Sequence, residues 1–128
     1  ALLEAAAQPS VFAAGEQILK CGEAGDGRVF FIESGQVSVL VPTEDGSHQR
    51  VASLGPGMNF GEMVLLGQTT RSATVYADTE LHCCVLEVQD FERISAEAPH
   101  FRAIVLENLA RDLVDKLRRA TQCIAALA

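Results

Sequence analysis

The stretch VFFIESGQVSVLV, residues 29–41, places two runs of β-branched and aromatic residues on either side of Ser34-Gly35-Gln36. Such residues favour extended backbone, and a short glycine-containing turn between two such runs is typical of a β-hairpin. The sequence therefore predicts two neighbouring antiparallel strands that form a hairpin with its turn at Gly35.

Further short strand candidates follow this stretch. A turn at residues 44–47 leads into a candidate strand at 50–54, and residues 72–77 and 81–86 form two more around Asp78-Thr79-Glu80. Short strands spaced about 8 to 12 residues apart indicate an antiparallel barrel or sandwich, because parallel strands need long crossover connections. We therefore predict a small closed β-roll.

The second half of the chain has a helical pattern. All 10 glycines lie between Gly15 and Gly67, so turns concentrate in the first half. After Pro99 the apolar residues recur every three or four positions, which predicts one long amphipathic helix, preceded by a shorter helix from near Val88 to near Ala98. This long helix can pack on its own barrel or, through about three heptads, pair with a copy of itself. The stripe that fits such a seam is Leu106, Leu109, Leu113, Leu117, Ala120, Ile124 and Leu127.

Length and composition limit the class of protein. A chain of 128 residues suits one domain, and 48% hydrophobic residues can build a core. We expect this domain to span residues 1–128, with the β-roll at about 10–87 and the C-terminal helices at about 88–127. Because the sequence starts at Ala1, as if within a helix, we expect a piece of a larger protein.

Charge and cysteine content indicate the setting. Seventeen acidic against 10 basic residues give a net charge of −7, which argues against a general nucleic-acid binder. Four scattered cysteines, no secretory signal pattern and no run of about 20 apolar residues predict a soluble chain with no membrane insertion. We expect it in the cytoplasm, or at the cytoplasmic face of a membrane protein.

The connection at residues 55–75, GPGMNFGEMVLLGQTTRSATV, contains the candidate binding residues. Between residues 46 and 77 the only acid is Glu62, and the only bases are Arg50 and Arg71. The apolar run at 63–66 fits one helical turn, and the unpaired N–H groups at the start of a helix attract anions. Arg71 can clamp a phosphate while Glu62 accepts from hydroxyls, a combination that suits a sugar phosphate. Alternatively, Arg71 is a solvated charge and Glu62 only favours the helix dipole.

The segments FGEMVLL, residues 60–66, and RSATV, residues 71–75, closely resemble the phosphate-binding cassette of cyclic nucleotide-binding domains. Such domains occur in cAMP receptor proteins, protein kinase regulatory subunits and cyclic nucleotide-gated channels. Residues 12–16, 31–37 and 54–57 agree as well, so the resemblance covers about residues 10–117. It implies a mainly β fold: an eight-stranded antiparallel, jelly-roll-like β-roll with a short cassette helix and a long C-terminal helix.

The resemblance also implies roles for single residues. Glu62 would accept a hydrogen bond from the ribose 2′-hydroxyl, and Arg71 would pair with the exocyclic oxygens of the cyclic phosphate. Backbone N–H groups around Gly61 and Ala73, with the Ser72 hydroxyl, would complete the phosphate shell. One Arg and several amides can offset a single negative charge, so no metal and no cofactor is expected besides the ligand. The expected ligand-binding set is Gly61, Glu62, Met63, Val64, Arg71, Ser72 and Ala73.

The sequence is compatible with two nucleotides and offers two candidate contacts to the base. A hydroxyl at Ser72 serves the phosphate of cAMP and can also contact the guanine amino group of cGMP, so cAMP is favoured and cGMP stays open. Thr70 stands where many members of the family have proline. Arg118 and Arg119 are candidates for capping the base, or else solvated charges near the helix C-terminus.

We expect a regulatory module that relays nucleotide occupancy through its C-terminal helices to a parent protein, and not an enzyme. No catalytic motif is present, and His82, Cys83 and Cys84 would alternate faces on a strand and could not jointly hold zinc. The histidine cluster of a metal-binding cupin is missing too, and no residue in this chain is expected to read DNA. The alternative is a degenerate β-roll that acts only in dimerisation or protein interaction.

Overall fold

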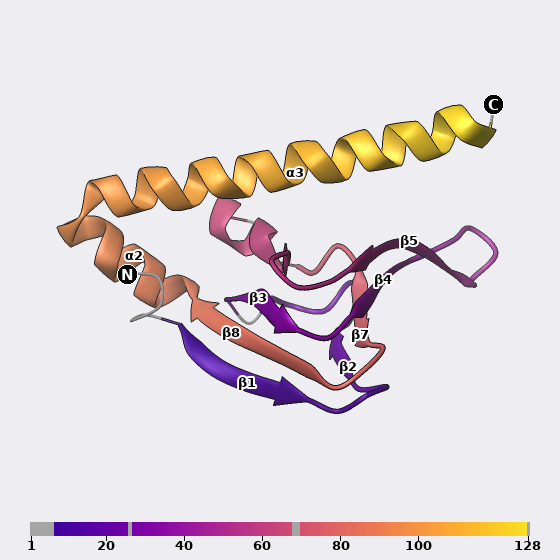
Figure 1. Cartoon of the computed structure of the whole chain (residues 1–128), viewed down its shortest axis with the longest axis horizontal. Helices are drawn as coiled ribbons and strands as arrows, with labels where there is room; N and C mark the ends of the chain where they lie inside the picture. The colour runs from indigo at the N-terminus through magenta and orange to yellow at the C-terminus, as the bar shows by residue number, and fades with distance from the viewer. Residues whose placement is uncertain (1–6, 26, 68–69, 128) are drawn as a thin grey trace.

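The computed structural model describes residues 7–25, 27–67 and 70–127, without the side chains of Met63, Leu66 and residues 119–127. Its strands form two four-stranded antiparallel sheets (Figure 1). In spatial order, the first sheet contains β1 (Gln8–Phe12), β8 (Leu81–Glu87), β3 (Arg28–Ser34) and β6 (Asn59–Phe60). The second contains β2 (Gln17–Leu19), β7 (Thr74–Ala77), β4 (Val37–Pro42) and β5 (His48–Leu54).

Three helical elements complete the part of the fold that the structure describes. The short 3-10 helix η1 (Glu62–Leu66) follows β6, and α2 (Val88–Glu97) and α3 (Pro99–Leu127) follow the last strand. Figure 1 shows α3 running along one side of the roll, with η1 between this helix and the strands. The predicted fold, an antiparallel β-roll with a cassette helix and a long C-terminal helix, is confirmed.

The predicted hairpin at Gly35 is wrong. Strand β3 pairs with β6 and β8, whereas β4 pairs with β5 and β7, so the chain passes from one sheet to the other at this turn. The crossing is tight: Gly35 has a φ of +101°, and a Cβ there would lie 2.5 Å from the Glu80 carbonyl oxygen. Local alternation and a glycine predict two strands and a turn, but they do not specify the strands' partners. The turn at residues 44–47, in contrast, does join a true hairpin, in which β4 pairs with β5.

Two hydrophobic clusters hold the roll and the helices. The first lies inside the roll, where the rings of Phe30 and Phe60 stack with centroids 4.7 Å apart. The second joins Val29 to η1 and to both C-terminal helices through Leu65, Phe91 and Phe101. Because successive residues of a strand point to opposite faces, Val29 and Phe30 place β3 in both clusters.

The long helix packs on its own domain over its first turns. Phe101, Val105 and Leu109 are buried in the second cluster, whereas Val114 and Leu117 are 46% and 67% exposed. Of the predicted stripe, Leu109 is buried in this cluster and Leu106 packs against it, whereas Leu117 is exposed. The side chains of Ala120, Ile124 and Leu127 lie outside the described residues. Within the ranges described, none of the helices combines the length and apolarity needed to span a membrane.

Candidate functional site

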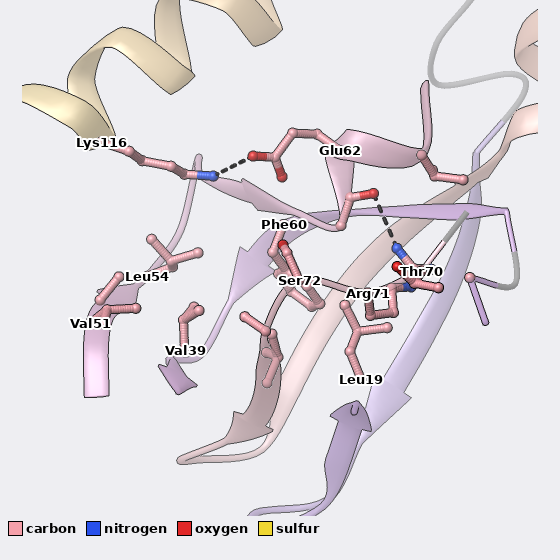
Figure 2. A pocket seen from close by; sticks show the side chains of 16 residues that line it. Leu19, Val39, Val51, Leu54, Phe60, Glu62, Thr70, Arg71, Ser72 and Lys116 are labelled. Carbon is pink, nitrogen blue, oxygen red and sulfur yellow. Dashed lines mark hydrogen bonds and ion pairs between the residues drawn. The ribbon is translucent and has the colours of Figure 1, made fainter. Parts of the chain in front are cut away.

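A cavity of about 280 Å³ lies beside η1, between the strands of the second sheet and α3 (Figure 2). Val39, Val51 and Leu54 form an apolar wall on one side. The polar side chains around it come from three segments of the chain: Glu62 from η1, Thr70, Arg71 and Ser72 from the connection before β7, and Lys116 from α3. An apolar wall with a few convergent polar groups is the usual make-up of a small-molecule site.

Arg71 is held by backbone carbonyl groups. Its side chain is buried, with Nη1 donating to the Gly61 carbonyl oxygen at 3.2 Å and Nη2 to that of Arg28 at 3.1 Å. The backbone is fixed as well, because the Arg71 amide donates to Glu23 and its carbonyl accepts from Gly22, both at 2.9 Å. The burial of a guanidinium group needs such partners. Arg71 is thus a permanent cation in a fixed position at the cavity.

Glu62 begins η1 and is only 6% exposed. Its Oε1 accepts a hydrogen bond from Lys116 Nζ at 3.0 Å, and the same ammonium group donates to the Asn59 carbonyl oxygen at 2.9 Å. Figure 2 shows Lys116 reaching from α3 to Glu62 across the top of the cavity. The Glu62 carboxylate is therefore a hydrogen-bond acceptor that is paired with the ammonium group of Lys116.

A second polar contact joins α3 to β6. The side-chain amide of Asn59 donates through Nδ2 to Oδ2 of Asp112, one helical turn before Lys116. Asn59 is buried, and its Oδ1 has no hydrogen-bond partner among the described residues. The helix thus meets the short strand before the cassette through two charged side chains, Asp112 and Lys116.

The structure brings the predicted residues together. Gly61, Glu62 and Val64 of the first cassette segment and Arg71, Ser72 and Ala73 of the second all line the one cavity. Met63 lies in η1, and its side chain is outside the described residues. Of the two candidates for a base contact, Arg118 is exposed and does not line the cavity, and the Arg119 side chain is not described.

Lys116 was not predicted from the sequence. It lies 54 residues from Glu62 and 57 from Asn59, so no local motif connects them. The available signal was its spacing of four from Asp112 on the same helix, which places both side chains on one helix face. With Arg71 and Glu62, it makes two cations and one carboxylate around the cavity, which leaves one net positive charge.

Among the side chains that the structure describes, the thiols and histidines do not form a competing site. Cys83 is 1% exposed, and burial, with smaller effects from Cys84 and Glu33, raises the pKa of its thiol from 9.0 to about 11. At neutral pH this group is a thiol and a poor nucleophile. Among the described residues, no group of three or more His, Cys, Asp and Glu side chains is placed to hold a metal ion.

Comparison with protein families matches residues 9–98 to the family described as "Cyclic nucleotide-binding domain". Glutaminase 1 of Bradyrhizobium diazoefficiens is 42% identical over 106 residues, which are 83% of this chain and 16% of that protein. The cAMP-dependent protein kinase type II regulatory subunit of Drosophila melanogaster is 41% identical over 81 residues, 62% of this chain and 21% of that protein. The chain therefore spans less than a quarter of either relative.

Solved structures show the same fold. The crystal structure of a cyclic nucleotide-binding domain from Methylobacillus flagellatus superposes with a TM-score of 0.89 at 24% identity. The match covers 97% of this chain and 69% of that one. At this identity the likeness supports the arrangement of the β-roll and its helices, and the chemistry of the cavity is argued from the residues above.

Proposed function

Because the chain belongs to the cyclic nucleotide-binding domain family, we propose that its cavity binds a cyclic nucleotide, with cAMP favoured over cGMP. The observation that carries the proposal is that Glu62 and Arg71 line one cavity, although eight residues lie between them in the sequence. A buried cation and an acceptor carboxylate beside an apolar wall match a ligand that has one negative charge, a hydroxyl and a flat ring.

Each part of the nucleotide has a candidate partner. Arg71 pairs with the exocyclic phosphate oxygens, and Glu62 accepts from the ribose 2′-hydroxyl. Backbone N–H groups around Gly61, Met63, Val64 and Ala73 and the hydroxyl of Ser72 surround the phosphate, and the base lies against the apolar wall. Ser72 is exposed at the cavity and can serve either nucleotide. The name of the kinase relative, a regulatory subunit of a cAMP-dependent protein kinase, supports the preference for cAMP.

The domain serves a larger protein in this proposal. The kinase relative is by name a regulatory subunit, and the two relatives extend far beyond the matched region. Nucleotide binding draws η1 inward, and this movement re-docks α2 and α3 because Leu65 packs in one cluster with Phe91 and Phe101. The helices then present a changed surface to the parent protein or, through α3, to a second copy of the chain. We also expect Leu66 to shift with η1, and its side chain lies outside the described residues.

Calorimetric titration with cAMP and with cGMP tests the proposal. We expect saturable heat with both and tighter binding of cAMP. Arg71→Ala should weaken binding by about 100-fold, because it removes charge-assisted hydrogen bonds to the phosphate. Arg71→Lys, which keeps the charge without the forked geometry, should recover part of this loss. Arg50→Ala removes the same charge from an exposed position on β5 and is the matched control, with unchanged affinity expected.

Two results would contradict the proposal. No heat with either nucleotide would favour the alternative of a degenerate β-roll that acts only in dimerisation or protein interaction. Equal affinity in the unaltered chain and in a folded Arg71→Ala variant would show that the phosphate binds elsewhere.

A further inference from the structure

Lys116 is the charged residue of the cavity that has no role in the account above. We propose that it is a positioning residue, whose ammonium group holds one oxygen of the Glu62 carboxylate so that the other oxygen faces the ribose 2′-hydroxyl of the nucleotide. The inference rests on the proposed function, and it adds a requirement that α3 take part in ribose recognition.

The position of the Lys116 ammonium group is defined by two acceptors. It donates to Glu62 Oε1 at 3.0 Å and to the Asn59 carbonyl oxygen at 2.9 Å, so its location is set by a backbone group as well as by the carboxylate. The side chains of Lys116 and Glu62 are 24% and 8% exposed. An ion pair so far removed from water is weakly screened and holds its geometry better than a surface pair.

The second carboxylate oxygen is suited to the ligand. Within residues 7–25, 27–67 and 70–127, Oε1 of Glu62 accepts from Lys116, and no hydrogen bond to Oε2 occurs. A carboxylate accepts on both oxygens, so occupation of Oε1 leaves Oε2 able to accept from a hydroxyl group. Lys116 thereby fixes the rotation of the carboxylate that presents Oε2.

Charge gives a second reason for a cation at this place. A cyclic phosphate is an anion, and an unpaired carboxylate in the same cavity would repel it and would itself be costly to bury. The ammonium group offsets the charge of Glu62, which leaves the charge of Arg71 for the phosphate. The polar contact to the ribose is thus compatible with the anionic ligand.

The three charged residues of the cavity come from two parts of the chain, and this couples the site to α3. Glu62 and Arg71 belong to the cassette, whereas Lys116 belongs to α3, so the ribose contact forms fully only while α3 lies on β6 and η1. By thermodynamic reciprocity, a nucleotide with a 2′-hydroxyl then stabilises the docked helix more than one without it.

The test compares cAMP with 2′-deoxy-cAMP in calorimetric titrations of the unaltered chain and three variants. The unaltered chain should bind cAMP at least about tenfold more tightly, since a hydrogen bond to a charged group is lost with the 2′-hydroxyl. Lys116→Met should reduce this ratio to about threefold or less. The loss of the Lys116 charge weakens the binding of both nucleotides by the same factor, so this effect cancels in the ratio of the two affinities. Lys116→Arg should restore most of the ratio. Arg111→Met, on the same helix with a 71% exposed side chain, is the matched control and should leave it unchanged.

Each outcome decides between the alternatives. An unchanged ratio in Lys116→Met overturns the positioning role even if both affinities fall, and tighter cAMP binding in that variant shows that Lys116 competes with the ligand. If the unaltered chain binds neither nucleotide, the proposed function fails and this inference with it. Thermal unfolding checks that the variants are folded. If Lys116→Met is not, Lys116→Leu, which also removes both the donor and the charge, must meet the same expectation.

Discussion

Arg71 and Gly61 depend on each other through one short contact. Gly61 has a φ of +76°, and a Cβ at this position would lie 3.0 Å from Arg71 Nη1 and 3.2 Å from the Arg28 carbonyl oxygen. The same Nη1 donates to the Gly61 carbonyl oxygen. The glycine is therefore required both by the backbone conformation and by the space that the guanidinium group occupies.

Gly61→Ala should weaken cAMP binding by about tenfold, because the added methyl group displaces the guanidinium group from the phosphate position. The variant should also lose about 1 to 2 kcal/mol of unfolding free energy, through backbone strain. Gly57→Ala is the matched control: it has a φ of +83° with nothing within 4 Å of the added Cβ. It should show a similar strain and an unchanged affinity. Thermal unfolding and calorimetric titration measure the two effects. Equal affinities for Gly57→Ala and Gly61→Ala would contradict the steric argument.

The candidate site could be predicted only where its residues are close in sequence. Glu62 and Arg71 stand out because one acid and two bases occur between residues 46 and 77. Lys116 does not stand out in the sequence, because helical periodicity identifies an apolar stripe but does not show which part of the sheet lies under a given turn of the helix. Arg118, two residues further on, has the same charge but is exposed. The difference comes from the rotation of α3 on the β-roll, which is set by tertiary packing.

Among the secondary structure elements, strands and helices were predictable but strand pairing was not. Alternating apolar residues and a glycine turn correctly indicated β3 and β4, and apolar residues that recur every three or four positions indicated the long C-terminal helix. The two edges of β3 pair with β6 and β8. Strand β8 lies about 50 residues away in sequence, so the local pattern does not identify it as a partner. A turn at Gly35 is compatible with a hairpin and with a crossing between sheets. The close approach of Gly35 to the loop around Glu80 favours the crossing between sheets.

The docking of α3 on β6 can be tested through Asp112. Asp112→Ala leaves the buried Asn59 amide without its acceptor, so we expect a loss of about 1 to 3 kcal/mol in unfolding free energy. Amide exchange around residues 109–116 should become faster, because one of the polar contacts of this turn is gone. Asp115→Ala, an exposed position on the same helix, is the control and should change stability by less than about 0.5 kcal/mol. Equal stabilities of the two variants in chemical denaturation would show that the Asn59 contact does not hold the helix.

For the molecule as a whole, the two hydrophobic clusters define a route from the cavity to the helices. Phe60, which lines the cavity, belongs to the cluster inside the roll, and Leu65, in the same short helical segment as Glu62, belongs to the cluster with Phe91 and Phe101. Closely packed side chains transmit small shifts because they have few alternative arrangements. In the proposed function, we therefore expect α2 and the first turns of α3 to accommodate a movement of η1 toward the nucleotide.

This route predicts where cAMP changes amide hydrogen exchange. At saturating nucleotide, exchange should slow at residues 55–75 around the cavity and also in α2 and the first turns of α3, by about tenfold more than in β1. Strand β1 lies at the edge of the first sheet, next to β8, and reports the general stabilisation that any bound ligand gives. Leu65→Ala, which truncates the connecting side chain, should keep binding but lose the additional protection of α2. Mass spectrometry of exchanged peptides measures all three regions. If α2 and β1 slow equally in the unaltered chain, the nucleotide stabilises the domain without a specific relay to its helices.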